Sequence, residues 1–331
     1  MQGARPGAPI FIVVWVLLVL AAAAPARAAS FQGPLQVRNG FPLAAILDAP
    51  YLERAVQEDS LSFGLSHSSI DFPESDAGLD FRIDLEATEL AVRYRKTVSG
   101  FCEFGIDVPF VSFNGGFLDR SIVRFHEAFG IDSGKNAESS GLFRFEVDKD
   151  GLPVVRGESG RIGVGDIRAS VKKTVFRGKS FAAALAADLE FPSGDAGKGY
   201  GNGRLDKRVA LLAEGSFGGR FHAVANIGKV FPGDLHGLTT LRFDDFRYGG
   251  LSIEAALSSR SGLLAQIFVQ DTPLPKGGLV FPVLLADPML VTVGYRYRSG
   301  GYGIEFSLTE NLRPSITPDL SLNVTMKRIL P

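Results

Sequence analysis

The fold class is decided by the stretch Met289–Asn311, which reads MLVTVGYRYRSGGYGIEFSLTEN. Its first half alternates between apolar residues and polar or small ones, so the two kinds fall on opposite faces of a strand. One face holds Val291, Val293, Tyr295 and Tyr297, and the other holds Thr292, Gly294, Arg296 and Arg298. Ser299-Gly300-Gly301 supplies residues that accept a positive φ in a tight turn, and the alternation resumes after it. The stretch therefore predicts a β-hairpin with one apolar and one charged face.

Hairpins of this kind recur along the chain and predict about twelve strands. The strands are expected at residues 60–70, 87–97, 101–113, 165–176, 180–191, 207–217, 220–231, 249–258, 262–271, 289–298, 302–309 and 319–328. Short connections at 98–100, 177–179, 218–219, 259–261 and 299–301 alternate with long ones at 71–86, 114–164, 192–206, 232–248, 272–288 and 310–318.

Short turns on one rim and long loops on the other are typical of outer-membrane barrels. We therefore predict an all-β fold for residues 60–331, a transmembrane antiparallel β-barrel of about twelve strands with short periplasmic turns and long external loops. A β-sandwich is the alternative, but it rarely needs about twelve strands of about ten residues each.

Composition agrees with an exported barrel. The chain has 35 Lys and Arg against 36 Asp and Glu, so it lacks the basic surplus that nucleic-acid binding requires. Its one cysteine, Cys102, cannot form an internal disulfide, and a large sheet closed on itself can hold the fold instead. No segment after the N-terminus is apolar for long enough to predict a membrane-spanning helix, so any crossing is made by strands.

Residues 1–28 have the pattern of a secretory signal peptide. Arg5 precedes the apolar run Ile10–Ala24, and Ala26-Arg27-Ala28 fits the cleavage rule. A membrane anchor would need about 18 or more apolar residues. We expect export to the cell outer membrane, with outer-membrane lipid and the barrel assembly machinery as partners.

Residues 29–59 show no alternation and contain Pro34, Pro42 and Pro50, with a short helix expected at Tyr51–Gln57. Two placements are open for this segment: a periplasmic strap, or a plug folded into the lumen. In the long loop 114–164, the apolar spacing of Leu118, Ile122, Phe125 and Phe129 predicts a short amphipathic helix over 117–130. That helix is expected to be a lid folded onto the rim or against lipid headgroups, with substrate binding as the alternative.

A basic residue on the lipid face costs about 2–4 kcal/mol at mid-membrane, so we place the apolar faces against lipid. This choice puts charges of both signs inside the barrel. The predicted lumen-lining residues are Arg93, Arg95, Glu103, Asp107, Arg168, Glu214, Glu254, Arg296, Arg298 and Glu305. Lys96 and Lys173 break the alternation near the short-turn ends of their strands, where long side chains reach the headgroups. The lumen is expected to be wet or salt-bridged.

Four segments carry a family resemblance: GPLQVRNGFPL at Gly33–Leu43, FLDRSIVRFHEAFGI from Phe117, LEFPSGD at Leu189–Asp195 and FSLTENLRPSITPDLSLNV at Phe306–Val324. Together they resemble the domain-of-unknown-function 3187 family, an uncharacterised bacterial family of outer-membrane type, which implies location and fold but no activity. The FPSGD turn is also similar to a loop of phenol-degradation-transporter-like barrels. Such barrels commonly end in an aromatic residue, whereas this chain ends Arg328-Ile329-Leu330-Pro331, so strand pairing is expected to end at Lys327 or the assembly signal to be internal.

Catalytic patterns are sparse. The four histidines and Cys102 lack metal-ligand spacing, so we expect neither a metal nor a cofactor. His67 and Ser69 share one face of the first strand, predicted to face lipid, and resemble the His–Ser pair of outer-membrane phospholipase A. The simpler interpretation is two polar residues at headgroup level, and we expect no enzyme.

Three functions follow as hypotheses. The first is a channel or transporter for a small-molecule solute through a charged lumen. The alternatives are a structural or binding outer-membrane protein with a closed lumen, and a lipid hydrolase using His67 and Ser69. A barrel of about twelve strands can hold a channel or be filled by side chains, so the sequence leaves these open.

Overall fold

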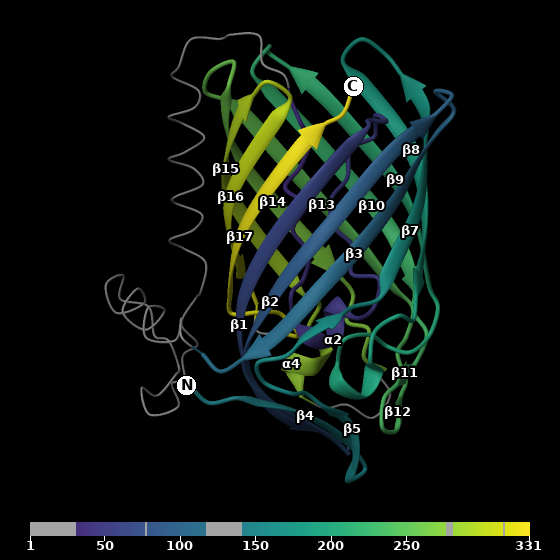
Figure 1. Ribbon diagram of the computed structural model, residues 1–331, viewed down its shortest axis with the longest axis vertical. Helices are drawn as coiled ribbons and strands as arrows, with labels where there is room; N and C mark the ends of the chain where they lie inside the picture. The colour runs from purple at the N-terminus through teal and green to yellow at the C-terminus, as the bar shows by residue number, and fades with distance from the viewer. Residues whose placement is uncertain (1–30, 77, 117–140, 276–280, 314) are drawn as a thin grey trace.

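The computed structural model describes residues 31–76, 78–116, 141–275, 281–313 and 315–331, and these form a closed antiparallel β-barrel (Figure 1). Its twelve strands are β1 Ser60–Asp76, β2 Leu79–Val98, β3 Cys102–Asn114, β7 Ile167–Arg177, β8 Phe181–Phe191, β9 Asp206–Phe217, β10 Phe221–Phe231, β13 Phe246–Ala256, β14 Ser261–Gln270, β15 Met289–Ser299, β16 Tyr302–Asn311 and β17 Leu320–Ile329. Each pairs with its neighbours in the chain, and β1 pairs with β17 to close the ring. The predicted barrel is confirmed.

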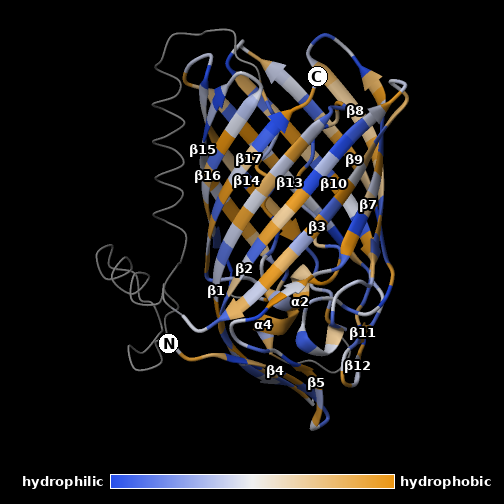
Figure 2. Ribbon diagram, in the orientation of Figure 1, coloured by the Kyte–Doolittle hydropathy of each residue, from blue (hydrophilic) through white to orange (hydrophobic). Residues whose placement is uncertain are grey.

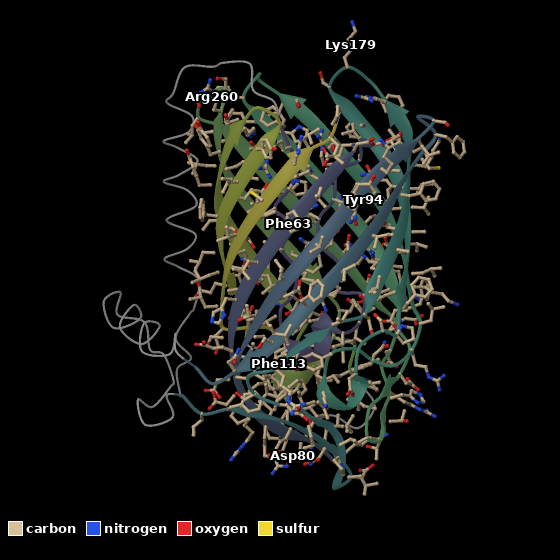
Figure 3. All side chains as sticks on the ribbon, viewed as in Figure 1. Phe63, Asp80, Tyr94, Phe113, Lys179 and Arg260 are labelled. Carbon is tan, nitrogen blue, oxygen red and sulfur yellow. The ribbon has the colours of Figure 1, made fainter. Side chains whose placement is uncertain are left out.

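The pairing of β1 with β17 runs from Ser60 opposite Ile329 to Ser69 opposite Leu320. It therefore passes Lys327, so the first of the two expectations for this strand is wrong, and the second, an internal assembly signal, stays a prediction. The hairpin turns are tight: Gly300 and Gly301 have φ of 56° and 83° between β15 and β16, a conformation that glycine adopts without strain. We call this rim, which carries Lys179 and Arg260, the short-turn end, and the opposite rim the long-loop end (Figure 3).

Apolar and polar residues alternate along the barrel strands (Figure 2). Tyr295 is 40% exposed on the outer face, whereas the next residue, Arg296, is 0% exposed and faces inward. Phe63 and Tyr94 are likewise exposed on the outside (Figure 3). The outer surface thus presents a continuous apolar band of the kind that lipid solvates.

The predicted loop at 71–86 is wrong, because β1 and β2 continue through it beyond the barrel rim. Two further strands, β4 Arg144–Lys149 and β5 Leu152–Arg156, add to this extension, and β6 Ile162–Val164 pairs with β3. The alternation persists there because Ile83 and Phe81 are buried against loop residues. The helix predicted at 117–130 and the signal peptide at 1–28 lie outside the described residues.

Short elements gather at the long-loop end around a hydrophobic cluster that includes Phe81, Phe145, Leu235 and Leu284. These elements are α2 Pro42–Ala45, η2 Ala196–Lys198, β11 Leu235–His236, β12 Thr240–Leu241 and α4 Pro282–Leu285. No helix in the described ranges is both long and apolar enough to cross a bilayer.

Residues 31–59, hereafter the plug, lie inside the barrel (Figure 1). The plug descends from the short-turn end to α2 and returns to Ser60, where β1 begins. The helix predicted at Tyr51–Gln57 is absent, and α2 is the plug's helix instead. The reason is that a wall side chain takes backbone N–H groups that the helix would use: Ala55 and Val56 donate to Glu214 at 2.9 and 3.5 Å.

Candidate functional site: the plugged lumen

The structure places all ten predicted lumen-lining residues on inward faces of the barrel, each at most 8% exposed. Most of their charges meet partners either on the wall or on the plug. Arg296 illustrates the first kind, since its Nε lies 2.9 Å from Glu305 and its Nη1 pairs with Glu254, which also pairs with Arg298. Buried charges need such partners, because desolvation of an unpaired ion is costly.

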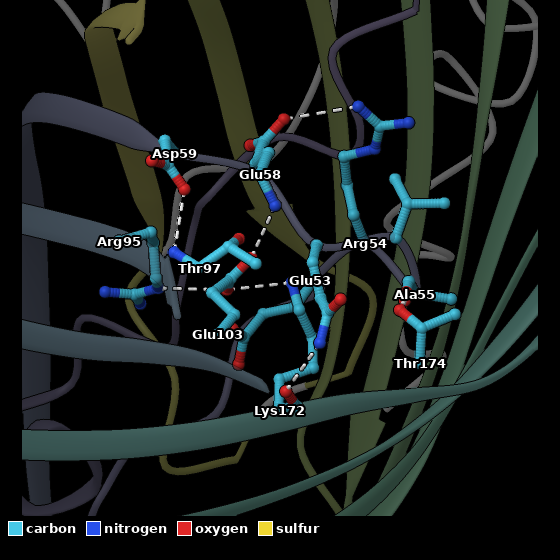
Figure 4. A network of polar contacts seen from close by, with 12 residues as sticks. Glu53, Arg54, Ala55, Glu58, Asp59, Arg95, Thr97, Glu103, Lys172 and Thr174 are labelled. Atoms are coloured by element: carbon cyan, nitrogen blue, oxygen red, sulfur yellow. Dashed lines mark hydrogen bonds and ion pairs between the residues drawn. The ribbon is translucent and has the colours of Figure 1, made fainter. Parts of the chain in front are cut away.

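The returning half of the plug is held by the second kind of contact (Figure 4). Glu58 donates its backbone N–H to Glu103 at 2.7 Å, and its carboxylate pairs with Lys327. Glu103 also pairs with Lys172 at 2.9 Å. One plug residue therefore connects side chains from β3, β7 and β17.

Tyr51 lies in the middle of a cationic part of the wall. Its hydroxyl donates to Asp107 at 2.8 Å and accepts from Arg95 at 2.6 Å. The guanidinium carbons of Arg168 and Arg93 lie 4.5 and 4.9 Å from the centre of its ring, within cation–π range. Asp107 pairs with Arg95 at 2.5 Å and also with Arg168, so one carboxylate serves several cations.

The pKa values of three plug carboxyls diverge. Burial raises the pKa of Asp48 to about 6, although Arg208 and Arg168 counteract part of that effect. Burial acts in the same direction on Glu53 and Glu58, but the surrounding cations, led by Arg208 at Glu53 and by Lys327 at Glu58, together outweigh it and hold each pKa at about 2. Two of the three carboxyls are therefore strongly favoured as anions.

The descending half of the plug makes fewer ionic contacts. Leu35 and Val37 pack with Leu264 of β14, and Arg38 donates to Glu89 at 3.0 and 3.2 Å. Wall glycines make room for this half: a Cβ on Gly303 would lie 2.1 Å from the Gln32 side-chain oxygen. The close approach requires glycine there, so the inner wall is shaped to the plug.

Three cavities between the plug and the wall have volumes of about 50, 20 and 20 Å³. A larger one of about 250 Å³ lies at the short-turn end, lined by Phe31, Arg54, Glu214, Lys179 and His222 among others. With the plug in place, the lumen is largely filled.

Sequence reasoning did not identify the plug residues Asp48, Tyr51, Glu53, Arg54 and Glu58 as site residues. They stand in an irregular segment, so no period indicated where they would point. The available signal was the density of charge at Glu53–Asp59, ERAVQED, in a segment without strand alternation.

His67 and Ser69 are not open to lipid as predicted. Ser69 is 1% exposed and His67 is partly buried. The ring nitrogens of His67 lie 2.8 Å from Thr88 Oγ1 and 3.0 Å from Glu86 Oε2, on the neighbouring strand. Within the described ranges, no group of His, Cys, Asp and Glu side chains has the arrangement of a metal site.

The basic residues that broke the alternation find local partners. Lys96 pairs with Asp59, where the plug joins β1, and Lys173 lies 3.6 Å from the ring centre of Phe101. Both lie near the short-turn end. A cation there remains close to water and headgroups.

The fold resembles that of solved outer-membrane proteins. An outer membrane channel from Pseudomonas putida F1 superposes with a TM-score of 0.57 at 12% identity, covering 85% of this chain and 98% of that chain. The NanC porin gives a TM-score of 0.47 at 7% identity, covering 82% and 100%. The toluene transporter TodX of Pseudomonas putida gives 0.39 at 11% identity, covering 89% and 98%.

Sequence comparison assigns the chain to a family. No curated protein matches the chain. The family described as "Protein of unknown function (DUF3187)" matches residues 10–328, nearly the whole chain. This chain therefore belongs to the DUF3187 family.

Proposed function

We propose that the protein is an outer-membrane channel that passes a small solute when the plug moves. The observation that carries the proposal is that a separate segment, rather than the side chains of the wall alone, fills the lumen. The inner wall is polar and charged, and its space is filled by a segment joined to the barrel wall at Ser60. If the plug leaves, the barrel that remains has a polar, hydrated interior.

The fold shared with the Pseudomonas putida F1 channel supports this proposal, since it places the chain in an architecture that conducts solutes in at least one protein. The apolar outer band supports the location. We expect the mature protein in the outer-membrane fraction, inserted by the barrel assembly machinery, with heat-modifiable migration on gels. Recovery as a freely soluble protein would contradict the location.

Conductance in planar bilayers tests the channel directly. The mature chain and a variant lacking residues 31–59 are purified and reconstituted at matched protein density. We expect rare, small openings from the full chain and a sustained conductance from the deletion variant, because the deletion empties the lumen. Heat-modifiable migration of both samples is the control for folding. A folded deletion variant that stays electrically silent would contradict the proposal.

One observation favours a structural or binding protein with a closed lumen as the second candidate. The hydrophobic cluster at the long-loop end joins plug residues such as Phe41, Leu47 and Leu52 to loop residues such as Phe145 and Leu284. Burial of side chains of this size contributes about 1.5–3 kcal/mol each and opposes displacement of the plug. A silent full chain together with a silent deletion variant would favour this candidate.

A further inference from the structure

The cavity of about 50 Å³ lies between the descending half of the plug and the wall formed by β1, β2, β3 and β17. Phe113 and Tyr200 line it toward the long-loop end, and Gly64, Arg93 and Thr325 line it toward the short-turn end. It thus follows the barrel axis along the part of the plug that has the fewest ionic contacts with the wall.

Arg93 supplies this cavity with a positive charge that has no carboxylate within hydrogen-bond distance. Its side chain is buried, with the residue 4% exposed, and neither Nε nor Nη1 has a hydrogen-bond partner. Nη2 reaches only the Gln36 carbonyl at 3.4 Å. The nearest carboxylate, Asp107, lies 4.0 Å from Nε and is already engaged by Arg95, Arg168 and the Tyr51 hydroxyl.

The other charged side chains lining the cavity have hydrogen-bond partners. Arg38 is bonded to Glu89. Asp166 accepts backbone hydrogen bonds from Gly194 at 2.7 Å and Asn202 at 2.9 Å. The cavity therefore presents, in Arg93, a guanidinium with two unbonded nitrogens, beside neutral polar groups and apolar side chains such as Val37 and Val111.

We propose that this cavity binds a small monocarboxylate, with its carboxylate at Arg93 Nη1 and its alkyl part against Val37 and Val111. A carboxylate suits the site because it can accept from the unbonded Nη1 and neutralise the guanidinium, whereas a dianion would leave a second negative charge among Glu89, Asp107 and Asp166. The volume corresponds to about 3–5 water positions at roughly 10–15 Å³ each, the size of acetate or propionate. The proposal rests on the proposed channel function, because it names the class of solute that the channel would carry.

Binding is tested on the purified full chain in detergent, by calorimetric titration with sodium propionate against propionamide and sodium chloride at equal ionic strength. We expect saturable binding of propionate, none of propionamide, and a loss of affinity of at least about tenfold in Arg93→Gln. Arg93→Lys, which keeps the charge, should recover part of it. Lys179→Gln, which removes an exposed cation at the rim, is the matched control and should bind like wild type.

A second variant keeps the test decisive if Arg93→Gln does not fold. A Cβ at Gly64 would lie 2.7 Å from Arg93 Nη1, so Gly64→Ala must shift the guanidinium. A folded Gly64→Ala variant with unchanged propionate affinity would overturn the site, as would equal binding of propionate and propionamide. Carboxylate binding in a protein that never conducts would refute the channel and leave the site standing. Conductance without carboxylate binding would refute only the site.

Discussion

Arg54 of the plug and Glu214 of β9 form an ion pair with an N–O distance of 2.9 Å. The same carboxylate accepts the backbone N–H of Ala55 at 2.9 Å, so it holds both the side chain and the backbone of the returning half of the plug. No other wall carboxylate described above both pairs with a plug side chain and accepts a plug backbone N–H. Glu214 is therefore a main point of attachment for the plug.

Glu214→Gln should loosen the plug while leaving the barrel intact. The amide cannot neutralise Arg54, and loss of a hydrogen bond to a charged group costs about 1.5–3 kcal/mol. Limited proteolysis of the purified barrel should then cut within residues 31–59 at lower urea than in the wild type. Glu158→Gln is the matched control, because Glu158 pairs with Arg161 on the surface, where such pairs contribute about 0–1 kcal/mol. Equal protection in both variants would contradict attachment through Glu214.

Cysteine labelling distinguishes residues that face lipid from residues that face the lumen and are covered by the plug. In a Cys102→Ser background, cysteines replacing Tyr295 and Arg296 should both react slowly with a water-soluble thiol reagent, because one faces lipid and the other lies under the plug. Deletion of residues 31–59 should accelerate the reaction at 296 and leave 295 slow. Faster labelling at 295 than at 296 in the deletion variant would reverse the assignment of the faces.

The outer face of β9 offers a test of membrane depth. Leu211 lies at the middle of the strand and is 46% exposed, whereas Phe217 lies at its short-turn end and is 52% exposed. An arginine at 211 should destabilise the barrel in lipid vesicles by about 2–4 kcal/mol, and one at 217 by about 0–1 kcal/mol. Equilibrium unfolding by denaturant measures both. Similar losses at the two positions would argue against a bilayer spanning this part of the strand.

Plug docking should depend on pH in two directions. Asp48, which faces Arg168, Arg208, Asp188 and Glu190 on β7, β8 and β9, has its pKa raised from 3.8 to about 6. A raised carboxyl pKa means that the docked state binds the proton more tightly, so stability rises as the pH falls through 6 toward 3.8.

Glu53 and Glu58 act in the opposite sense, since each has its pKa lowered from 4.5 to about 2. Their contribution is fully present above pH 4.5 and is lost as the pH falls toward 2. Protection of the plug from protease should therefore be greatest near pH 5, measured with an acid-tolerant protease. In Asp48→Asn the rise between pH 7 and pH 5 should disappear while the loss in acid remains. A variant that keeps the full rise would contradict the role of Asp48.

The sequence by itself determined the barrel. Alternation such as that of Tyr295 and Arg296 separates the faces, and it is a property of neighbouring residues that holds wherever the strand is placed. The glycine turns and the alternating loop lengths then set the connectivity. The same local rule did not show that β1 and β2 continue to Asp76 and Leu79, because Pro73 and the charged residues around it resemble a loop until β4 pairs with them.

Only the tertiary structure decided what fills the barrel. Tyr51 meets Asp107, and Glu58 meets Lys327, across 56 and 269 residues of sequence. Tyr51 and Glu58 stand outside α2, in a part of the plug without a repeating backbone conformation, where the N–H groups of Glu53, Ala55 and Glu58 bond to wall side chains. No periodicity can predict which wall residue each plug residue will reach, because that depends on the curvature of the closed barrel. The unpartnered Nη1 of Arg93 has the same origin: its surroundings exist only once the barrel has closed around the plug.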